Sequence, residues 1–590
     1  MRVMALVVPA VLVGLLQAAP VQAANYPLEI TQPQPNLNLT NRFYKAYPGL
    51  PYEVRLAVVG GLYPYQFSLS TAPAGMTIDP HRGTISWPTP AESGSPHQVE
   101  ARVVDGEGTQ QTVSWSITVP AQGFRFLDAV NGLTAAQGGT GSIDNPWRTI
   151  ADWYEGNDYP SKTADSYVNE FLYWREGVYS LADVYKEDSV AGMHPGRVPV
   201  LASAKPVVWL AYPGEQPIVD HAYNGAPDSG AFIIFYASSE NVYIDGLEFR
   251  NTKCKGIEMG SDGSNQVLRN LTMHELHYGE DGANCAFVMT GTGDPGDNMV
   301  IQDSIFHDLN IVSAAAMLKI YAKNKLLIED NTLHTVTGSS DSEGIALKGG
   351  EMTRLTVRGN VIHDVPRKSI GGNMHTLRDS EILFNCVYNA ADAAIDINQD
   401  GVATNLHIYR NTVLGRVQLR NTDSADGPFH LYSNVFVNDD SGTPDGSHVF
   451  HESVSDPSRV VLTDNLVGFP RDGITDATGN LSPAHQQYLG THGCQLTEDR
   501  GGTGGGDGRG GSGASGGSAT GVGGGDHGEG GLGGPGSNAG SADGSDAGCG
   551  CVAAGKPSRS LASLIALLGL AFGVMRRSRR ASRAFSAARR

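Results

Sequence analysis

The chain has 590 residues, too many for one ordinary hydrophobic core, so several domains are expected. Its formal net charge is −19, with 42 lysines and arginines against 61 aspartates and glutamates. A chain this acidic has little surface that would neutralise phosphates, so we expect no nucleic-acid partner. Glycine reaches 75 residues, but much of it lies in one C-terminal tract, so the average composition describes no single domain.

The N-terminus has the pattern of a secretory signal over residues 1–23. Arg2 supplies the positive start, residues 4–16 form an apolar segment, and Ala23 ends a small-residue cleavage site. The apolar run is too short to span a bilayer, which favours a cleaved signal and export. Of the six cysteines, Cys254 and Cys285 could bridge neighbouring coils of a repeat fold, the alternative being lone buried cysteines.

Residues 25–121 form the first predicted domain. Runs such as 52–56 and 99–103 alternate polar and apolar residues, and clusters of turn residues separate them. With the phrases at 73–78 and 83–87, the segment resembles the immunoglobulin-like, cadherin-like modules of bacterial surface proteins. The resemblance implies a β-sandwich of about seven strands with a spacer or adhesion role. The clustered acidic linker with which cadherins bind calcium is absent.

Residues 122–490 form a repeat region that opens with the phrases at 145–150 and 174–179. A six-residue motif then recurs at intervals of 24, 33, 27, 29, 25, 26 and 23 residues. It begins with an apolar residue and two variable residues, continues with a position that is often Asn, and ends with one variable residue and a second apolar residue. The Asn position is occupied in turn by Leu247, Leu271, Ser304, Asn331, Asn360, Asn385, Asn411 and Asn434. Such a period predicts a solenoid. The opening resembles the cap and first coil of pectate-lyase-like proteins, so the expected all-β fold is a right-handed parallel β-helix. Its asparagines are expected to form a hydrogen-bonded ladder at an inward corner.

The C-terminal part has two predicted segments. Residues 495–548 are rich in Gly, Ser and Asp and predict a disordered linker. Residues 549–590 hold Cys549 and Cys551, an apolar run at 561–575 and an arginine cluster. This order resembles the myxobacterial-type C-terminal sorting tail, which implies processing near the cysteines and attachment to the outer membrane or cell envelope. A plain transmembrane anchor is the alternative. We therefore expect a protein at the cell surface, or one secreted after the tail is processed.

Outward side chains on one sheet of a solenoid are the expected place for a bound polymer. Counting back about twelve residues from each corner position gives a first column, which consists of Thr290, Lys319, Lys348, Asn373, Asn398 and Arg420. A second column, two residues earlier, consists of Glu258, Ala346, Gly371, Asp396 and Gln418. Lys319 and Lys348 are therefore expected to stack. Two ammonium groups roughly 5 Å apart repel each other, which lowers the pKa of one and makes it a candidate general base.

The segment Asp341-x-Glu343-x4-Lys348 is similar to the metal-and-base segment of the chondroitinase-B and alginate-lyase family. The resemblance implies that Asp341 and Glu343 hold a calcium ion, which neutralises a uronate carboxylate, and that Lys348 is the base. Lys319 would be a second carboxylate neutraliser. The chain departs from the family where Asn373 replaces its arginine acid; Arg354, Arg378 and His375 remain open as substitutes.

The sequence therefore predicts a surface protein that acts on polysaccharide, with a lyase that cleaves uronate polymers by β-elimination as the first hypothesis. Asn373, Asn398, Arg420 and His375 are the candidate substrate contacts. A glycoside hydrolase ranks lower, because Asp396 and Asp400 are the one acidic pair near the groove floor. A non-catalytic carbohydrate-binding or adhesion protein is the competing class, so whether the protein is an enzyme stays open.

One more column consists of His274, His307, His334 and His363, each just after an inward apolar residue. Stacked histidines suggest a metal site or a pH switch. The alternative is an ordinary turn phrase of this repeat, as at residues 360–364.

Overall fold

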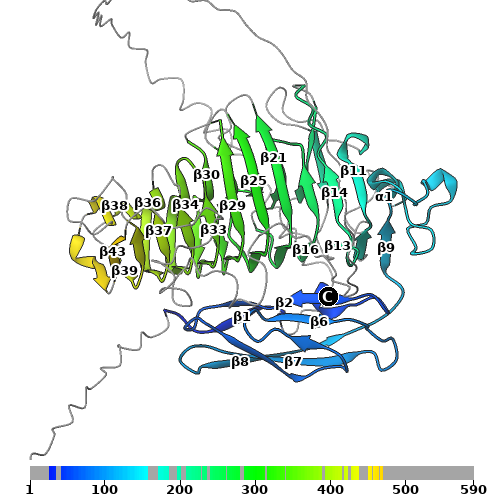
Figure 1. Ribbon diagram of the computed structural model, residues 1–590, viewed down its shortest axis with the longest axis horizontal. Coiled ribbons are helices and arrows are strands. Elements are labelled where there is room, and N and C mark those ends of the chain that lie inside the picture. Colours follow the sequence, from blue (N-terminus) through cyan, green and yellow to red (C-terminus); the bar gives the residue numbers. More distant parts are fainter. Residues whose placement is uncertain are drawn as a thin grey trace, which may run out of the picture. The chain divides into compact units, whose positions relative to one another are not determined.

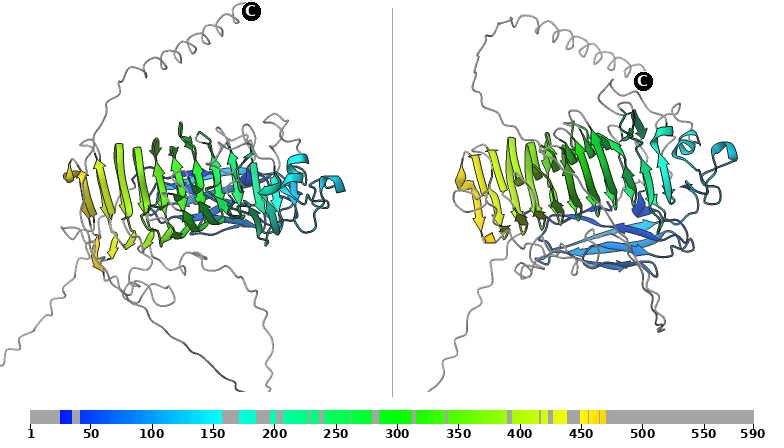
Figure 2. Two further views of the ribbon diagram at one scale, coloured as in Figure 1. Left: turned by 90° about the horizontal axis from the view of Figure 1, so that it is seen from above. Right: turned by 45° about the horizontal axis from the view of Figure 1, so that its top comes forward.

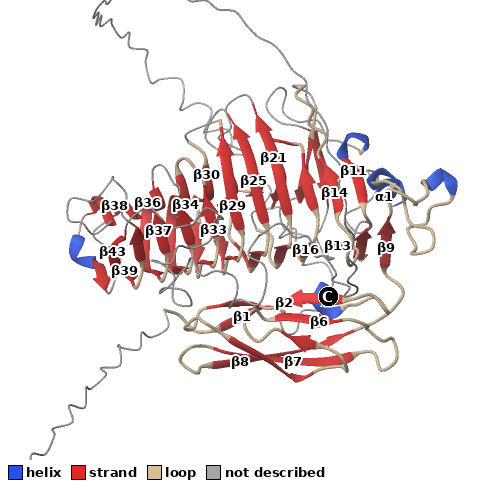
Figure 3. Ribbon diagram, in the orientation of Figure 1, coloured by secondary structure: helices blue, strands red, loops and turns tan. Residues whose placement is uncertain are grey.

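The computed structural model describes residues 25–34, 41–156, 171–184, 196–200 and most of 207–469. The gaps in the last range are 227–228, 236–239, 261, 279–284, 312–314, 339–340, 389–392, 415–416, 423–426, 438–448, 455 and 464. The predicted signal, linker and sorting tail lie outside the described residues. Strands dominate the described part (Figure 3). Its helices are short, and none has the length and apolar character to cross a membrane.

The N-terminal module is a sandwich of antiparallel strands. Its described strands are β1 (Glu29–Gln32), β2 (Tyr52–Arg55), β3 (Ala57–Val59), β4 (Gln66–Thr71), β5 (Thr77–Ile78), β6 (Thr84–Trp87), β7 (His97–Val104) and β8 (Gln110–Ile117). One sheet has the order β2-β6-β5, another has the order β4-β7-β8, and β1 pairs with β3. Alternate residues of β7 are buried, as period two requires. The predicted immunoglobulin-like fold of this segment is confirmed.

The remaining strands wind into a parallel β-helix with three sheets, whose stacked coils are visible in Figure 1 and from two further sides in Figure 2. The first sheet, which we call the module sheet because the module packs on it, contains β9 (Phe124–Leu127), β10 (Phe171–Trp174), β13 (Val207–Ala211), β16 (Val242–Asp245), β20 (Gln266–Arg269), β24 (Met299–Gln302), β28 (Leu327–Glu329), β32 (Thr356–Arg358), β39 (Phe429–Tyr432) and β42 (Val460–Thr463). The long strands β34 (Lys368–Leu383) and β36 (Ala393–Tyr409) enter it with their C-terminal halves.

The second sheet, the lysine sheet, carries Lys319 and Lys348. It contains β12 (Gly196–Val200), β15 (Ala231–Phe235), β19 (Lys255–Met259), β22 (Ala286–Thr290), β26 (Ala316–Tyr321), β30 (Glu343–Lys348), the N-terminal halves of β34 and β36, β38 (Val417–Thr422) and β41 (Val449–Val454). Short strands between this sheet and the module sheet are β23 (Gly296–Asp297), β27 (Lys323–Asn324) and β31 (Glu351–Thr353).

The third sheet, the histidine sheet, carries the predicted histidine column. It contains β11 (Gly177–Ser180), β14 (Pro217–Asp220), β17 (Glu248–Arg250), β21 (Thr272–Tyr278), β25 (Ile305–Ile311), β29 (Thr332–Thr337), β33 (Val361–His363), β35 (Cys386–Tyr388), β37 (Thr412–Leu414), β40 (Val435–Val437) and β43 (Leu466–Phe469), with β18 (Thr252–Lys253) beside β21. The short helices are η1 (Arg42–Tyr44), η2 (Ala135–Gln137), α1 (Ile150–Gly156), η3 (Leu181–Asp183) and η4 (Pro457–Arg459).

Inward side chains of all three sheets form one apolar core that runs along the axis, from Leu127 to Leu431. At its start α1 places Trp153 edge-on against Trp209, with ring centroids 6.1 Å apart, in the region predicted to be a cap. Of the two alternatives that the sequence left open for Cys254 and Cys285, the structure shows the cross-coil disulfide. The parallel solenoid predicted from the repeat is therefore confirmed.

The corner between the module sheet and the histidine sheet holds the predicted asparagine ladder. Asn360 Nδ2 donates to Asn385 Oδ1 at 2.9 Å, and Asn385 Nδ2 donates to Asn411 Oδ1 at 3.0 Å. The same Oδ1 atoms accept the backbone N–H of the preceding asparagine, and each Nδ2 also reaches a carbonyl oxygen of the preceding coil. All partners of these buried amides are thus satisfied within the ladder. It extends from Asn331 to Asn465, one coil beyond the predicted members.

The module packs on the outward face of the module sheet. Apolar side chains there join the core of the module, namely Phe171, Tyr173, Val208, Leu210, Tyr243, Val267, Val300 and Leu327. Polar contacts follow the same line: Arg42 Nη1 donates to Tyr173 Oη at 3.1 Å, and Asn25 Nδ2 donates to the Ser380 carbonyl oxygen at 3.2 Å. Where the module covers it, the module sheet is therefore buried on both faces, which explains apolar strands such as β13 that do not alternate.

Candidate functional site

The two lysines of the predicted catalytic column do not stack. Lys319 lies opposite Ala346 of the next coil, whereas Lys348 lies opposite Tyr321. Lys319 belongs to the second predicted column, and the structure confirms the register of that column: Ala346, Gly371, Asp396 and Gln418 follow it in successive coils. The expected repulsion between adjacent ammonium groups therefore has no geometric basis. All five residues of this column are buried, however, so they do not form the open groove floor that was predicted.

A glycine turn explains the two-residue error. Strands β26 and β30 are offset by 27 residues in sequence, but beyond the turn the offset is 29, as for Asn324 and Thr353. Gly349 and Gly350 supply the extra pair, both with positive φ, at 42° and 71°. The prediction counted residues backwards from the corner asparagine, and that count passes through this turn before it reaches the lysine sheet. The two extra residues therefore shift the predicted register of the lysine sheet by two positions.

Lys348 lies in a charge cluster around Glu343. Its Nζ is 3.0 Å from Glu343 Oε2, while Arg367 Nη1 is 3.6 Å and Lys368 Nζ is 3.9 Å from Glu343 Oε1. Lys368 also forms an ion pair with Asp396. Glu343, Lys368 and Asp396 are buried, whereas the side chains of Lys348 and Arg367 are 23% and 35% exposed. The buried carboxylate thus holds two cationic side chains at the surface of the lysine sheet.

The predicted calcium ligands do not fit a calcium ion in this arrangement. Glu343 has three cations within 4 Å, so its charge is already compensated. Asp341 is 65% exposed and its Oδ1 lies 3.9 Å from Arg367 Nε. Within the part of the chain that the structure describes, no three His, Cys, Asp or Glu side chains are grouped to hold a metal. Calcium therefore stays a prediction from the resemblance, and no step of the proposal below uses it.

The other predicted contacts are placed by their backbone alone. Asn373 pairs with Asn398, and Asn398 with Arg420, so these three residues form a column as predicted. Their side chains, and that of His375, are outside the described part. Arg354, one of the residues left open as proton donor, contacts Glu29 of the module at 3.0 Å. It is therefore committed to the module side of the β-helix.

A lysine with a lowered pKa does lie near the lysine sheet, but it is Lys323. Burial lowers the pKa of Lys323 to about 8, and its Nζ donates to the carbonyl oxygens of Gly263 at 2.8 Å and Gly260 at 3.3 Å. Its side chain is fully buried, so it has no access to a polymer on the surface. We interpret it as a structural group of the turn between two sheets.

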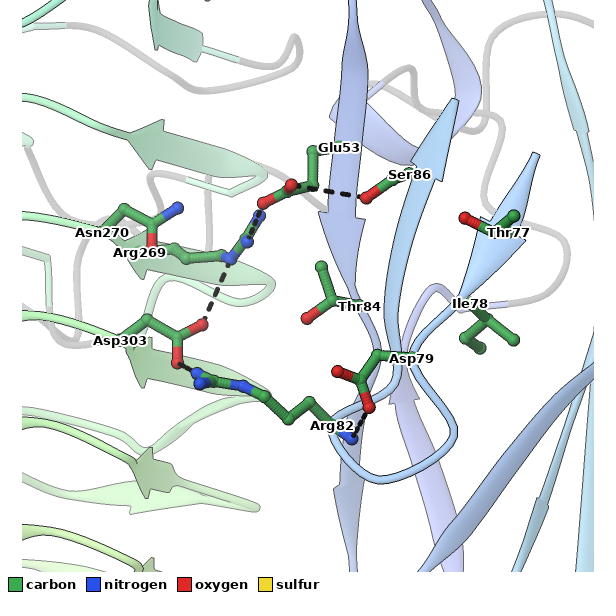
Figure 4. Close-up of a pocket in the computed structure, with 10 residues that line it drawn as sticks. All are labelled: Glu53, Thr77, Ile78, Asp79, Arg82, Thr84, Ser86, Arg269, Asn270 and Asp303. Atoms are coloured by element: carbon green, nitrogen blue, oxygen red, sulfur yellow. Dashed lines mark hydrogen bonds and ion pairs between the residues drawn. The ribbon is translucent and has the colours of Figure 1, made fainter. Parts of the chain in front are cut away.

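A second site, absent from the sequence predictions, is a pocket of about 600 Å³ where the module meets the β-helix (Figure 4). It is lined by Glu53, Thr77, Ile78, Asp79, Arg82, Thr84, Ser86, Arg269, Asn270 and Asp303. Arg269 Nη2 donates to Glu53 Oε1 at 2.5 Å and Nε donates to Asp303 at 3.4 Å; Arg82 also pairs with Asp303. The charged side chains of its floor are thus paired with one another across the junction.

The junction also contains a carboxyl group that burial keeps neutral. Desolvation raises the pKa of Glu381 to about 8, and the opposing charge of Arg358 only partly offsets it. Arg358 donates to Tyr65 Oη of the module at 3.0 Å and pairs with Glu329 at 2.6 Å. The sequence shows the apolar strands of the module sheet and the charged residues between them, but it does not show that the N-terminal module packs on this sheet.

Fold and geometry define the class: a parallel β-helix that carries an N-terminal immunoglobulin-like module. A family model described as "Putative Ig domain" matches residues 35–120. No curated protein matches the chain significantly. Among solved structures, pectate lyase Pel9A has a TM-score of 0.31 and 11% identity, over 64% of this chain and 87% of that one. The Agl-KA catalytic domain has a TM-score of 0.18 and 9% identity, over 72% and 86%. At such scores neither likeness bears on activity.

Proposed function

We propose that the protein binds an acidic polysaccharide along the lysine sheet. The observation that carries the proposal is the position of Lys348 and Arg367, two partly exposed cations fixed by one buried carboxylate, Glu343. Cations held in place by a buried partner lose little side-chain entropy when they bind a second anion. A chain of net charge −19 otherwise repels uronate polymers, so a local pair of cations favours this sheet as the contact.

A column of polar residues in backbone register adds length to this contact. Asn373, Asn398 and Arg420 continue along the same sheet in successive coils, and neighbouring coils lie about 4.8 Å apart. An extended polymer along the axis would therefore meet one polar residue per coil. This supports binding of a chain rather than of a single sugar.

Cleavage by β-elimination is the catalytic form of the proposal, with Lys348 as the base and Lys319 as the carboxylate neutraliser. Two observations favour binding without cleavage. Lys348 is the cation of an ion pair, whereas a general base must present a neutral amine. Lys319 is 7% exposed and two positions away from register with Lys348.

One experiment separates the alternatives. The full chain is titrated calorimetrically with polygalacturonate, alginate and chondroitin sulfate, and absorbance of the unsaturated product is followed in parallel. Lys348→Gln and Arg367→Gln should each weaken binding about tenfold or more, the value of a charge-assisted hydrogen bond. Lys325→Gln, which removes a cation at the module junction, is the control and should bind as the wild type.

Each outcome is informative. Product formation that disappears in Lys348→Gln, with binding retained, would establish the lyase. Equal binding by wild type and both variants would contradict the proposed contact. Addition of calcium or of a chelator should leave the affinity unchanged, because Glu343 is already neutralised by cations.

We also propose that the protein is exported and held at the cell envelope by residues 549–590. The disulfide between Cys254 and Cys285 supports an oxidising compartment, where such bonds persist. Protease treatment of intact cells should degrade the full-length protein. A chain truncated before residue 549 should instead be found in the medium; retention of that chain on the cells would contradict the role of the tail.

A further inference from the structure

The predicted histidine column is a continuous stack of rings. His274, His307, His334 and His363 occupy the same position in β21, β25, β29 and β33. Successive ring centroids are 5.0, 5.1 and 5.0 Å apart and the ring planes differ by 2°. Corresponding nitrogen atoms therefore repeat along the axis at the spacing of the coils.

The next residue in the coil fixes the proton of two rings, those of His307 and His363. Asp308 and Asp364 have positive φ, at 56° and 54°, which is unusual for residues other than glycine and turns their side chains back. Asp308 Oδ2 lies 2.8 Å from Nδ1 of His307, and Asp364 Oδ2 lies 2.7 Å from Nδ1 of His363. A carboxylate accepts, so Nδ1 carries the proton and Nε2 of the neutral ring keeps its lone pair.

The central ring has a hydroxyl group in the place of the carboxylate, and a hydroxyl can either accept from Nδ1 or donate to it. His334 Nδ1 lies 2.9 Å from Thr335 Oγ1, and Thr335 has φ 61°.

Three rings of the column are partly exposed, and the side chains of His307 and His363 are 25% and 21% exposed. For His307, His334 and His363, Nε2 makes no hydrogen bond to a described residue, and none of these atoms is buried. His274 differs, because its Nε2 lies 3.1 Å from Glu248 Oε1. The column therefore offers three neighbouring imidazole nitrogens, with His334 in the middle.

We propose that adjacent imidazoles of this column bind a divalent transition-metal ion of the Cu²⁺, Ni²⁺ or Zn²⁺ type, through the Nε2 atoms of His334 and one neighbour. Imidazole suits these ions, and an Nδ1–H donated to a carboxylate is the usual support of a histidine ligand. With no larger grouping of His, Cys, Asp and Glu among the described residues, water completes the coordination.

The stack must tighten slightly to do this. Metal–nitrogen bonds of about 2.0–2.1 Å place two imidazole nitrogens of a tetrahedral ion about 3.3 Å apart. The rings are 5.0–5.1 Å apart and parallel within 2°. Each Nε2 must therefore move by about 1 Å, and the two ring planes must also turn toward the common ion by changes of side-chain rotamer, because an imidazole binds a metal in its own plane. A modest affinity follows, since the site has two protein ligands and is not fully preorganised.

Titration of the untagged full chain with CuCl₂, NiCl₂ and ZnCl₂ tests the proposal, with calorimetry for affinity and electron paramagnetic resonance for nitrogen ligands of Cu²⁺. The wild type should show two coordinated imidazoles per ion. His334→Ala should lose the site, because it belongs to both pairs. His307→Ala and His363→Ala should each keep one pair and bind within about twofold of the wild type, whereas the double variant should lose the site.

Two controls complete the design. His274→Ala, in the same stack but with its Nε2 already occupied, and His97→Ala, in the module, should bind as the wild type. Unchanged melting temperature in each variant confirms that the fold is intact; if His334→Ala fails to fold, the double variant decides. Binding should weaken below about pH 6, where protons compete for imidazole. Equal binding by wild type and His334→Ala, or no binding by wild type, would overturn the proposal and leave the column a purely structural stack.

Discussion

The module side and the lysine side of the β-helix hold their charges in different ways. On the module side, Arg55 is 3% exposed and pairs with Asp303, Glu329 and Asp330 of the β-helix, so a second domain completes the network. On the lysine side, Lys348 and Arg367 are satisfied by Glu343 of their own sheet and remain partly exposed.

The difference teaches which buried charges serve the fold and which serve a ligand. In a network completed by a second domain, every charge is already paired within the protein and none is left for a ligand. Breaking one of its pairs therefore costs free energy of unfolding. Cations that are anchored but still reach solvent can bind an additional anion. We therefore expect large stability effects on the module side and small ones, with altered binding, on the lysine side.

The largest expected effect is that of Arg55→Ala. It removes the cation shared by three carboxylates, although Arg82, Arg269 and Arg358 still contact Asp303 and Glu329. Breaking a buried pair costs about 3–5 kcal/mol of unfolding free energy, and the remaining cations place this variant at the lower end of that range. Denaturant unfolding measures it. Arg102→Ala, on an exposed position of the module, is the control and should change the value by less than about 0.5 kcal/mol. An equal effect of both substitutions would mean that the junction network does not stabilise the protein.

Second in size is Asn385→Ala in the ladder. It removes two donated and two accepted hydrogen bonds and leaves buried partners unsatisfied, for a loss of about 3 kcal/mol. Asn465→Ala, at the half-buried end of the ladder, should cost clearly less. Thermal melting of the two variants makes the comparison, and equal shifts would argue against a ladder that depends on its neighbours.

The third prediction concerns the turn that separates the two sides. Gly350→Ala introduces a Cβ at φ 71° that would lie 2.6 Å from Ala322 Cβ, and should cost about 2 kcal/mol. Gly214→Ala, with φ 81° and no atom within 4 Å, should show the backbone strain alone, about 1 kcal/mol. If Gly350→Ala also alters polymer binding, the turn positions Lys348 as well as lengthening the coil.

The last prediction is a slope rather than a single loss, namely the pH dependence of stability that comes from Glu381. Its folded pKa is about 8 against 4.5 for the exposed group, so the folded state binds more protons than the unfolded state between these values. Stability is therefore complete below about pH 4.5, falls as pH rises, by at most about 1.4 kcal/mol per pH unit, and falls no further above about pH 8. Glu381→Gln should flatten this slope, whereas Glu107→Gln on the exposed surface should not. A wild-type profile parallel to that of Glu381→Gln would contradict a neutral carboxyl group here.

The repeat, the corner and the histidine column could be predicted from the sequence because each depends on one spacing. Asparagines such as Asn360 and Asn385 recur beside an apolar position, and every coil must repeat that corner to keep the ladder bonded. The histidines follow the same corner by three residues, without an intervening turn, so their stacking was predictable too.

The register of the lysine sheet could not be predicted from the same count. Gly349 and Gly350 lie between Lys348 and Asn360 and lengthen the turn of that coil by two residues. A single sequence does not reveal which coil has the longer turn. The packing of the module was also missed. Strands β10 and β13 are apolar at consecutive positions, which indicates burial on both faces, but that pattern names no partner.

The position of the module has a consequence for how the solenoid comes apart. Coils of a repeat protein ordinarily touch only their neighbours, so they can fray from an end one at a time. Here a single compact domain is bonded to Tyr173 in an early coil and to Ser380 many coils later. Arg410, later still, donates to the carbonyl oxygen of Tyr63 in the module at 3.4 Å. Loss of any coil in between would also detach the module from its support. The spanned coils and the module should therefore unfold as one cooperative unit, while the coils beyond Arg410 remain free to open independently.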